Sequence, residues 1–168
     1  MSKRNVMAVS WLLASILGLG QVAADSTAAV PEMPQHADET RFTDDREAVM
    51  WRQEELKDIE SLIRQLRFDL VNNQDASVAI PRLEELAKRA SADNLLPAFI
   101  EGTHGRGSEA HPSIWEEWEE FAAGFDHLEA RIDDLIEAAN AEDYSNAARA
   151  ISDVGKSCKS CHRAYRYD

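Results

Sequence analysis

Three residues with reactive side chains stand close together near the end of the chain. Cys158 and Cys161 are three positions apart, and His162 follows directly. These are the only two cysteines among the 168 residues. In a helix, Cys158 and His162 would lie one turn apart on the same face, with Cys161 just around it. Two thiols and an imidazole placed in this way can attach a haem, bind a metal ion or form a redox pair.

The spacing C-x-x-C-H is the attachment signal of haem c. The two thiols add across the two vinyl groups of the haem, and the imidazole that follows reaches the iron from one face. The sequence therefore predicts one covalently bound haem c. Cys158 and Cys161 would be its attachment points, and His162 would be the axial ligand of the iron.

Other uses of this motif fit the sequence less well. A structural zinc site would need a fourth protein ligand, and a thioredoxin-like pair belongs at a helix N-terminus after a strand. A plain disulfide would leave His162 without a role. Beyond position 24, the remaining histidines show no paired spacing: His36, His104, His111 and His127.

Residues 1–24 have the pattern of a secretory signal peptide. Lys3 and Arg4 precede an apolar run, and the small residues Val22-Ala23-Ala24 form a cleavage-like site. A membrane anchor is the alternative, but the apolar run is shorter than the ~20 residues that a spanning helix needs. Export by this peptide predicts a periplasmic protein that does not reside in the membrane.

The charge of the remaining chain limits its partners. Removing Lys3 and Arg4 from the 18 basic residues leaves 16, against 31 acidic ones, a net charge of −15. This argues against nucleic acids and anionic membrane surfaces as partners. Residues 149–168, in contrast, hold five basic and two acidic side chains. These cations could guide a redox partner, or could simply complement a helix C-terminus and the haem propionates.

Four amphipathic segments can position the motif. Their apolar residues alternate steps of three and four, as in helices, and no stretch alternates with a period of two. The pattern predicts an all-α, antiparallel, left-handed four-helix bundle over residues 44–168. The expected helices begin near Asp44, Asp75, Ser113 and Asp143.

The connections are less regular. Pro81 fits the first turn of a helix but would kink an interior, and residues 91–112 are expected to form a long loop. Ser113 and Glu116 have the spacing of a capping box. Residues 25–43 are rich in proline, alanine and acidic side chains, and we expect a mobile leader or an arm over the surface.

Arg52 interrupts the apolar stripe of the first helix. On its own it could snorkel to water or pair with a nearby glutamate. A buried guanidinium keeps its proton and needs an anion, and a haem propionate would be a suitable partner.

The side of the iron opposite His162 decides the chemistry. Met33 falls in the leader and Met50 lies one position off the stripe, so neither is placed to be a sixth ligand. Leu56, one turn beyond Arg52, cannot bind iron. The sequence predicts a five-coordinate haem with an apolar cover.

The chain resembles the cytochromes c′, the high-spin branch of the class II cytochromes c. The resemblance rests on the segments Ala48–Leu56, Leu95–Thr103, Ala110–Trp115 and Asp153–Arg166, the last of which carries the haem signal. It implies the same four-helix bundle and a homodimer through the first two helices.

The resemblance also implies roles for single residues. Arg52 and Gln53 would lie against the haem, and Leu56 would be the distal residue. Arg166 would flank the axial histidine, and Glu109 falls near a haem-contact position of the family.

Two functions are consistent with these features. The first is electron transfer with a periplasmic redox partner protein. The second is binding of nitric oxide or carbon monoxide beside Leu56, because an aliphatic wall disfavours ligands that need a hydrogen bond and nitric oxide does not need one. A peroxidase would require a distal acid–base residue, and none is predicted, so we do not expect an enzyme.

Overall fold

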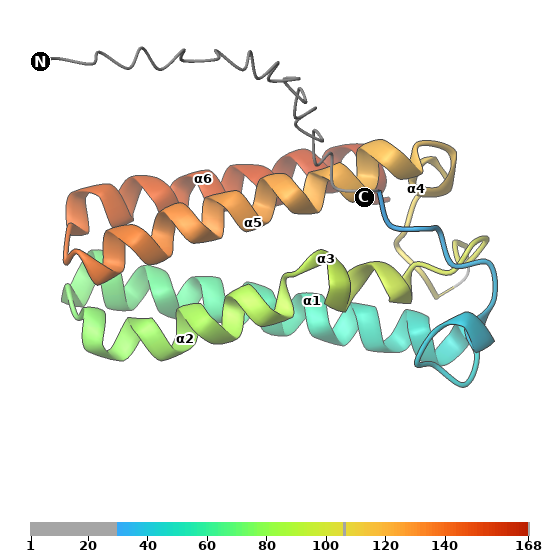
Figure 1. Cartoon of the computed structure of the whole chain (residues 1–168), viewed down its shortest axis with the longest axis horizontal. Helices are drawn as coiled ribbons and strands as arrows, with labels where there is room; N and C mark the ends of the chain where they lie inside the picture. The colour runs from blue at the N-terminus through green and yellow to red at the C-terminus, as the bar shows by residue number, and fades with distance from the viewer. Residues whose placement is uncertain (1–29, 106, 168) are drawn as a thin grey trace, which may run out of the picture.

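The computed structural model describes residues 30–105 and 107–167. In this range the chain forms a bundle of four long helices (Figure 1). They are α1 (Asp45–Arg67), α2 (Ala76–Arg89), α5 (Trp118–Asn140) and α6 (Tyr144–Tyr165). The predicted all-α four-helix bundle is therefore confirmed. The predicted signal peptide and residues 25–29 lie outside the described residues.

Aspartates begin three of these helices, as their spacing predicts. The carboxylates of Asp44, Asp75 and Asp143 each accept a hydrogen bond from the backbone N–H three residues further on. Each bond satisfies one of the free N–H groups of a first turn. Between α1 and α2 the chain makes a π-helical turn, Phe68–Asn73, and Gln74 then takes a left-handed φ of 53°.

Pro81 lies inside α2, beyond its first turn, and the helix continues through it. The side chain is exposed, so the ring meets water and not the core. The cost is the missing bond to the carbonyl of Ser77.

Two local expectations are wrong. Residues 91–112 are not one long loop, because α3 (Ala92–Leu95) and a 3-10 turn (Leu96–Ala98) occupy the first part. The capping box at Ser113 does not form. Ser113 is already inside a short helix, α4 (Ser113–Glu116), and its hydroxyl donates to the carbonyl of Ala164 at 3.0 Å. A contact with a distant part of the chain replaces the local cap.

The core is formed by apolar side chains of all four long helices. At the end of the bundle where α1 begins, a second cluster contains Phe42, Ala48, Ala98 and Ile100. The main cluster includes the fully buried residues Leu66, Leu70, Leu83, Leu86, Ile132, Leu135, Ile151 and Val154.

Residues 30–43 lie against this end of the bundle as an arm (Figure 1). The carbonyl of Pro31 accepts a bond from the indole N–H of Trp118 at 2.7 Å, and that of Pro34 accepts from the N–H of Glu101 at 2.8 Å. Phe42 is only 6% exposed. These contacts hold residues 30–43 against the surface of the bundle.

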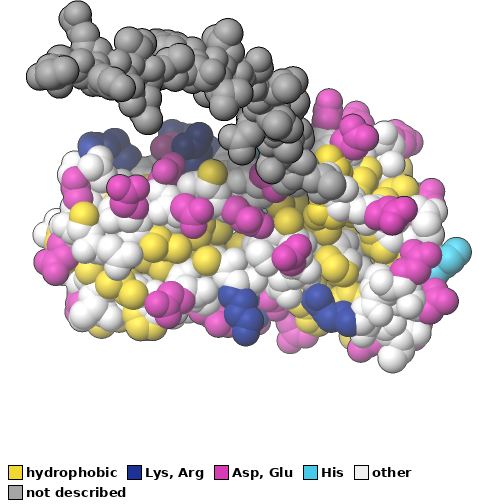
Figure 2. Space-filling view, viewed as in Figure 1, with side chains coloured by type: hydrophobic (Ala, Val, Ile, Leu, Met, Phe, Trp, Pro, Cys, Tyr) yellow, Lys and Arg dark blue, Asp and Glu magenta, His cyan; other side chains and the backbone are white. Residues whose placement is uncertain are grey.

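Figure 2 shows the surface above α2 and α5, where acidic side chains are widely spread and basic ones are few. None of the helices in the described residues is both long enough and apolar enough to cross a membrane.

Candidate haem site

The C-x-x-C-H motif occupies the last turns of α6. Val154 is the last fully buried residue of this helix. Cys158 and Cys161 are free, partly buried thiols, and Cys161 packs against the main core. His162 falls on the predicted stripe, but its side chain is exposed. The motif therefore lies where the apolar face of α6 leaves the core and reaches the surface.

The surroundings favour the uncharged forms of all three side chains. Burial raises the pKa of Cys158, and burial together with Cys158 raises the pKa of Cys161 to about 11. Desolvation and then Arg166 lower the pKa of His162, while Glu109 and Glu60 act in the opposite direction. A neutral imidazole has the lone pair that a metal requires. Thiols with a raised pKa are poor zinc ligands and slow partners in disulfide exchange.

Arg52 lies on α1 and is only 2% exposed. Its Nη1 donates to the carbonyl of Ala98 at 2.9 Å and to Oγ1 of Thr103 at 2.8 Å. Its Nη2 donates to the carbonyl of Thr103 at 2.5 Å and to Oγ of Ser108 at 2.8 Å. The ring of Phe99 lies 4.8 Å from the guanidinium carbon.

All four of these acceptors are neutral oxygens. Burial lowers the pKa of Arg52 to about 10, so the guanidinium remains charged at neutral pH. Within the described residues it has no carboxylate partner, and its Nε–H is the donor without a bond. A buried cation in this setting suits an additional anion.

The next residues of α1 contact the loop and the core. The amide of Gln53 donates to the carbonyl of Gly107 at 2.9 Å. Leu56 is partly buried and packs against the core that Cys161 also contacts. Glu60, one turn beyond Leu56, is close enough to His162 to act on its pKa. α1 and α6 are also in contact with each other in the bundle. Met50 is 59% exposed and offers no sulfur on that side.

Glu109 and Arg166 contact each other. The Nε of Arg166 donates to Oε2 of Glu109 at 2.8 Å, and its Nη2 lies 2.6 Å from the same oxygen. An isolated antiparallel bridge joins Ala110 to Arg166, and the N–H of Tyr167 donates to the carbonyl of Glu109 at 2.8 Å. These bonds hold the end of α6, next to His162, against the loop before α4.

Sequence reasoning missed some of the residues that shape this site. No sequence pattern identifies Ser108 as a partner of Arg52, because the two residues are 56 positions apart in the chain. Thr103 is part of the segment Leu95–Thr103, which resembles the family, but its role as the main partner of Arg52 was not predicted. Glu55 lies one position off the apolar stripe, yet it is buried.

The chain is similar to cytochromes c′ in both sequence and structure. A family model described as Cytochrome C' matches residues 47–166. The cytochrome c′ of Rubrivivax gelatinosus is 34% identical over 94 residues, which is 55% of this chain and 70% of that protein. The cytochrome c′ of Alcaligenes xylosoxydans xylosoxydans is 38% identical over 82 residues, which is 49% of this chain and 62% of that protein.

Solved structures agree with the sequence matches. Recombinant native cytochrome c prime from Alcaligenes xylosoxidans matches with a TM-score of 0.68 and 31% identity, over 76% of this chain and 100% of that one. A carbon monoxide-bound variant of the same protein matches with a TM-score of 0.66, and a nitric oxide complex of another variant with 0.68.

The residues present fit a covalently attached haem. Two partly buried thiols stand one turn apart with an imidazole beside them, and the core supplies an apolar wall at Leu56. Arg52 supplies a buried positive charge at a distance of one turn from that wall. This donor set suits a haem better than a bare metal ion, because thiols with a raised pKa and a single imidazole make a weak ion site.

Proposed function

The chain belongs to the cytochrome c′ family, and we propose that it is a periplasmic mono-haem cytochrome in which His162 is the axial ligand and Leu56 covers the open side. Haem c supplies an iron that exchanges single electrons and binds diatomic gases. The observation that carries the proposal is the placement of two partly buried thiols and His162 together in the last turns of α6, in a chain whose match to the family covers residues 47–166.

Each site residue then has a distinct task. Cys158 and Cys161 fix the haem to α6 through thioethers, and His162 presents a neutral imidazole. Arg52 can give its Nε–H and its charge to a propionate, and its other four N–H groups hold the loop that encloses this edge. Arg166, held by Glu109, keeps a positive charge beside the imidazole.

Electron transfer is the first function that we propose. It requires a partner to approach the haem edge, and exposed cations surround the motif. Lys159 and Arg163 on α6 are exposed, whereas the rest of the chain beyond position 24 carries a large negative charge. This distribution favours a redox partner whose docking surface is acidic.

Gas binding is the second candidate, and the aliphatic character of Leu56 favours it. Nitric oxide and carbon monoxide bind iron without help from a distal hydrogen bond, and both are bound by variants of a similar protein. Leu56→Ala should open the distal side and accelerate carbon monoxide binding to the reduced protein by about tenfold, a loss of ~1.4 kcal/mol of barrier.

Stopped-flow mixing with carbon monoxide measures this rate. Leu62→Ala is the matched control, because Leu62 is also a partly buried leucine of α1 that packs against the core. If the Leu56→Ala rate equals that of wild type, Leu56 does not cover the iron.

We also propose a homodimer through α1 and α2. Phe68, which begins the π-helical turn directly after α1, and Val78 on α2 are 57% and 42% exposed, and both line a shallow hollow. Exposed apolar side chains on one face are typical of a contact surface. Sedimentation velocity at micromolar concentration distinguishes a dimer from a monomer, and a monomer would contradict the proposal.

A further inference from the structure

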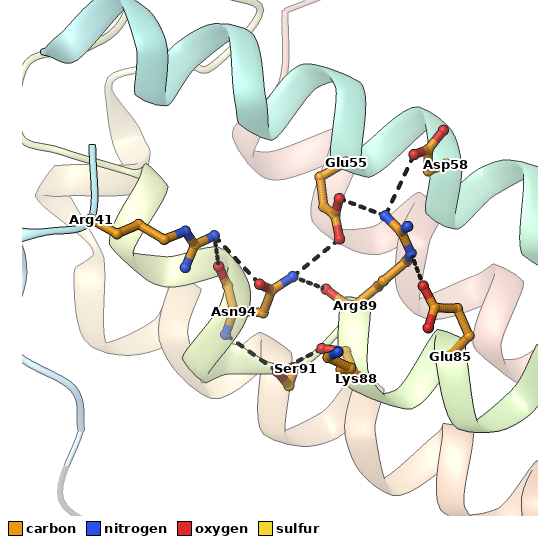
Figure 3. A network of polar contacts seen from close by, with 8 residues as sticks. All are labelled: Arg41, Glu55, Asp58, Glu85, Lys88, Arg89, Ser91 and Asn94. Atoms are coloured by element: carbon orange, nitrogen blue, oxygen red, sulfur yellow. Dashed lines mark hydrogen bonds and ion pairs between the residues drawn. The ribbon is translucent and has the colours of Figure 1, made fainter. Parts of the chain in front are cut away.

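Glu55 is a buried carboxylate that the proposed function leaves without a role. It directly precedes Leu56 and is 9% exposed. Its Oε2 accepts a bond from Nη1 of Arg89 at 2.7 Å, and its Oε1 accepts from Nδ2 of Asn94 at 3.2 Å (Figure 3). One side chain of α1 is thereby tied to α2 and to α3 at the same time.

The bonds continue beyond these two partners. The amide of Asn94 also donates to the carbonyl of Arg89 at 2.8 Å. Arg41, in the N-terminal arm, donates to the carbonyl of Asn94 at 2.9 Å. Arg89 is further bonded to Glu85 on its own helix and lies 3.4 Å from Asp58. The network links the arm, α1, α2 and α3 (Figure 3).

Glu55 can be replaced without leaving Arg89 as an unpaired charge, because Arg89 has other acidic partners. Arg89 keeps Glu85 and Asp58 as partners when Glu55 is absent. What is lost is the pair of hydrogen bonds that connects residue 55 of α1 to Arg89 of α2 and to Asn94 of α3. The pair is only partly buried, since the side chain of Arg89 is 31% exposed, so its net contribution to stability is small.

The position of Leu56 depends on the same stretch of α1. Residues 55 and 56 are consecutive in one helix, so a fixed Glu55 also fixes the backbone that carries the leucine. A ligand that enters on the distal side must displace this side chain or tilt the helix. The hydrogen bonds of Glu55 resist such movement and therefore raise the free-energy barrier to entry of the gas ligand.

We propose that Glu55 is a positioning residue, which through Arg89 and Asn94 holds Leu56 over the iron and so limits the rate of gas binding. The inference rests on the proposed function, because it takes Leu56 as the distal residue. It adds a specific determinant of ligand access that lies outside the haem contacts.

The test uses the reduced holoprotein and carbon monoxide as the probe. Glu55→Ala should accelerate carbon monoxide association at least about fivefold, the lower range of coupling between sites. Hydrogen exchange of the backbone amides of residues 56–60 should become faster in the same variant, because the local tie is lost. Glu55→Gln keeps one acceptor oxygen and should restore most of the wild-type rate.

Two comparisons separate positioning from simple destabilisation. Asp58→Ala removes an exposed partner of the same Arg89, and its rate should stay within about twofold of wild type, since surface pairs contribute little. Adding Glu55→Ala to Leu56→Ala should give no further acceleration, because the tie acts only through the leucine. Should Glu55→Ala fold poorly, Asn94→Ala cuts one tie and should give a smaller acceleration in the same direction.

The outcomes are distinct. If Leu56→Ala is fast but Glu55→Ala and Asn94→Ala bind carbon monoxide at the wild-type rate, the positioning role is overturned and the distal assignment stands. Fully additive acceleration in the double variant would likewise overturn it. If Leu56→Ala itself has no effect, the distal assignment fails and this inference fails with it.

Discussion

Arg52 is a charged residue on the otherwise apolar stripe of α1. A charged side chain on an apolar stripe either snorkels to water or is buried with partners, and the structure has this side chain buried. Its partners could not be predicted, because Ala98, Thr103 and Ser108 come from a loop about 50 residues away and are neutral. The hydrogen bonds explain how the loop is held, while a propionate remains the anion that we propose.

Replacing Arg52 should therefore destabilise the protein. Arg52→Leu leaves several buried oxygens without a donor and should lower the free energy of unfolding by about 3 kcal/mol. Denaturant unfolding of the holoprotein measures this change. Arg46→Leu is the control, because Arg46 is an exposed arginine of the same helix. Equal stability of the two variants would show that the loop does not depend on Arg52.

At the scale of the helices, local signals were sufficient where local bonds decide the structure. The aspartate caps and the alternating apolar steps predict the starts of α1, α2 and α6 closely. The sequence does not reveal the short α4, because the hydroxyl of Ser113 bonds to Ala164, 51 residues further on. Burial of Glu55 escapes prediction for the same reason, since Arg89 lies 34 positions away.

The end of α6 also allows a prediction about electron exchange. Lys159→Gln with Arg163→Gln removes two exposed cations beside the motif and should slow oxidation of the reduced protein by ferricyanide, an anionic reagent. The effect should be several-fold at about 10 mM ionic strength and should disappear near 1 M, where charges act over only ~3 Å. Stopped-flow absorbance gives both rates.

A second double variant controls for the change in net charge. Arg131→Gln with Arg149→Gln removes two exposed cations that lie outside the motif, on α5 and on the earlier part of α6. If both double variants slow ferricyanide oxidation equally, only the total charge matters and the proposed docking surface is wrong.

At the scale of the whole molecule, the attachment of the arm is the feature that the sequence indicates least. Its composition is compatible with a mobile leader or a surface arm, and Phe42, Arg41 and two backbone carbonyls attach residues 30–43 to the bundle end. Composition alone could not indicate this, because a single aromatic anchor is a weak signal in a proline-rich segment. The match to the family model begins at residue 47, after the arm.

Truncating the anchor tests whether the arm stabilises the fold. Phe42→Ala should lower the free energy of unfolding by about 3 kcal/mol, as for other buried phenylalanines. Met50→Ala, a large-to-small change at an exposed position nearby, should change it by less than about 0.5 kcal/mol. Denaturant unfolding that gives the wild-type value for Phe42→Ala would mean that the arm is not packed in solution.

The central claim is a haem c held by α6 with His162 on one side of the iron and no protein ligand on the other. An optical spectrum of protein exported from a host that matures c-type cytochromes tests it most directly. It should be recorded in the oxidised and reduced states, with and without nitric oxide. We predict the spectrum of a five-coordinate, high-spin haem c that changes when nitric oxide is added. A colourless protein, or a low-spin spectrum that nitric oxide does not alter, would contradict the account.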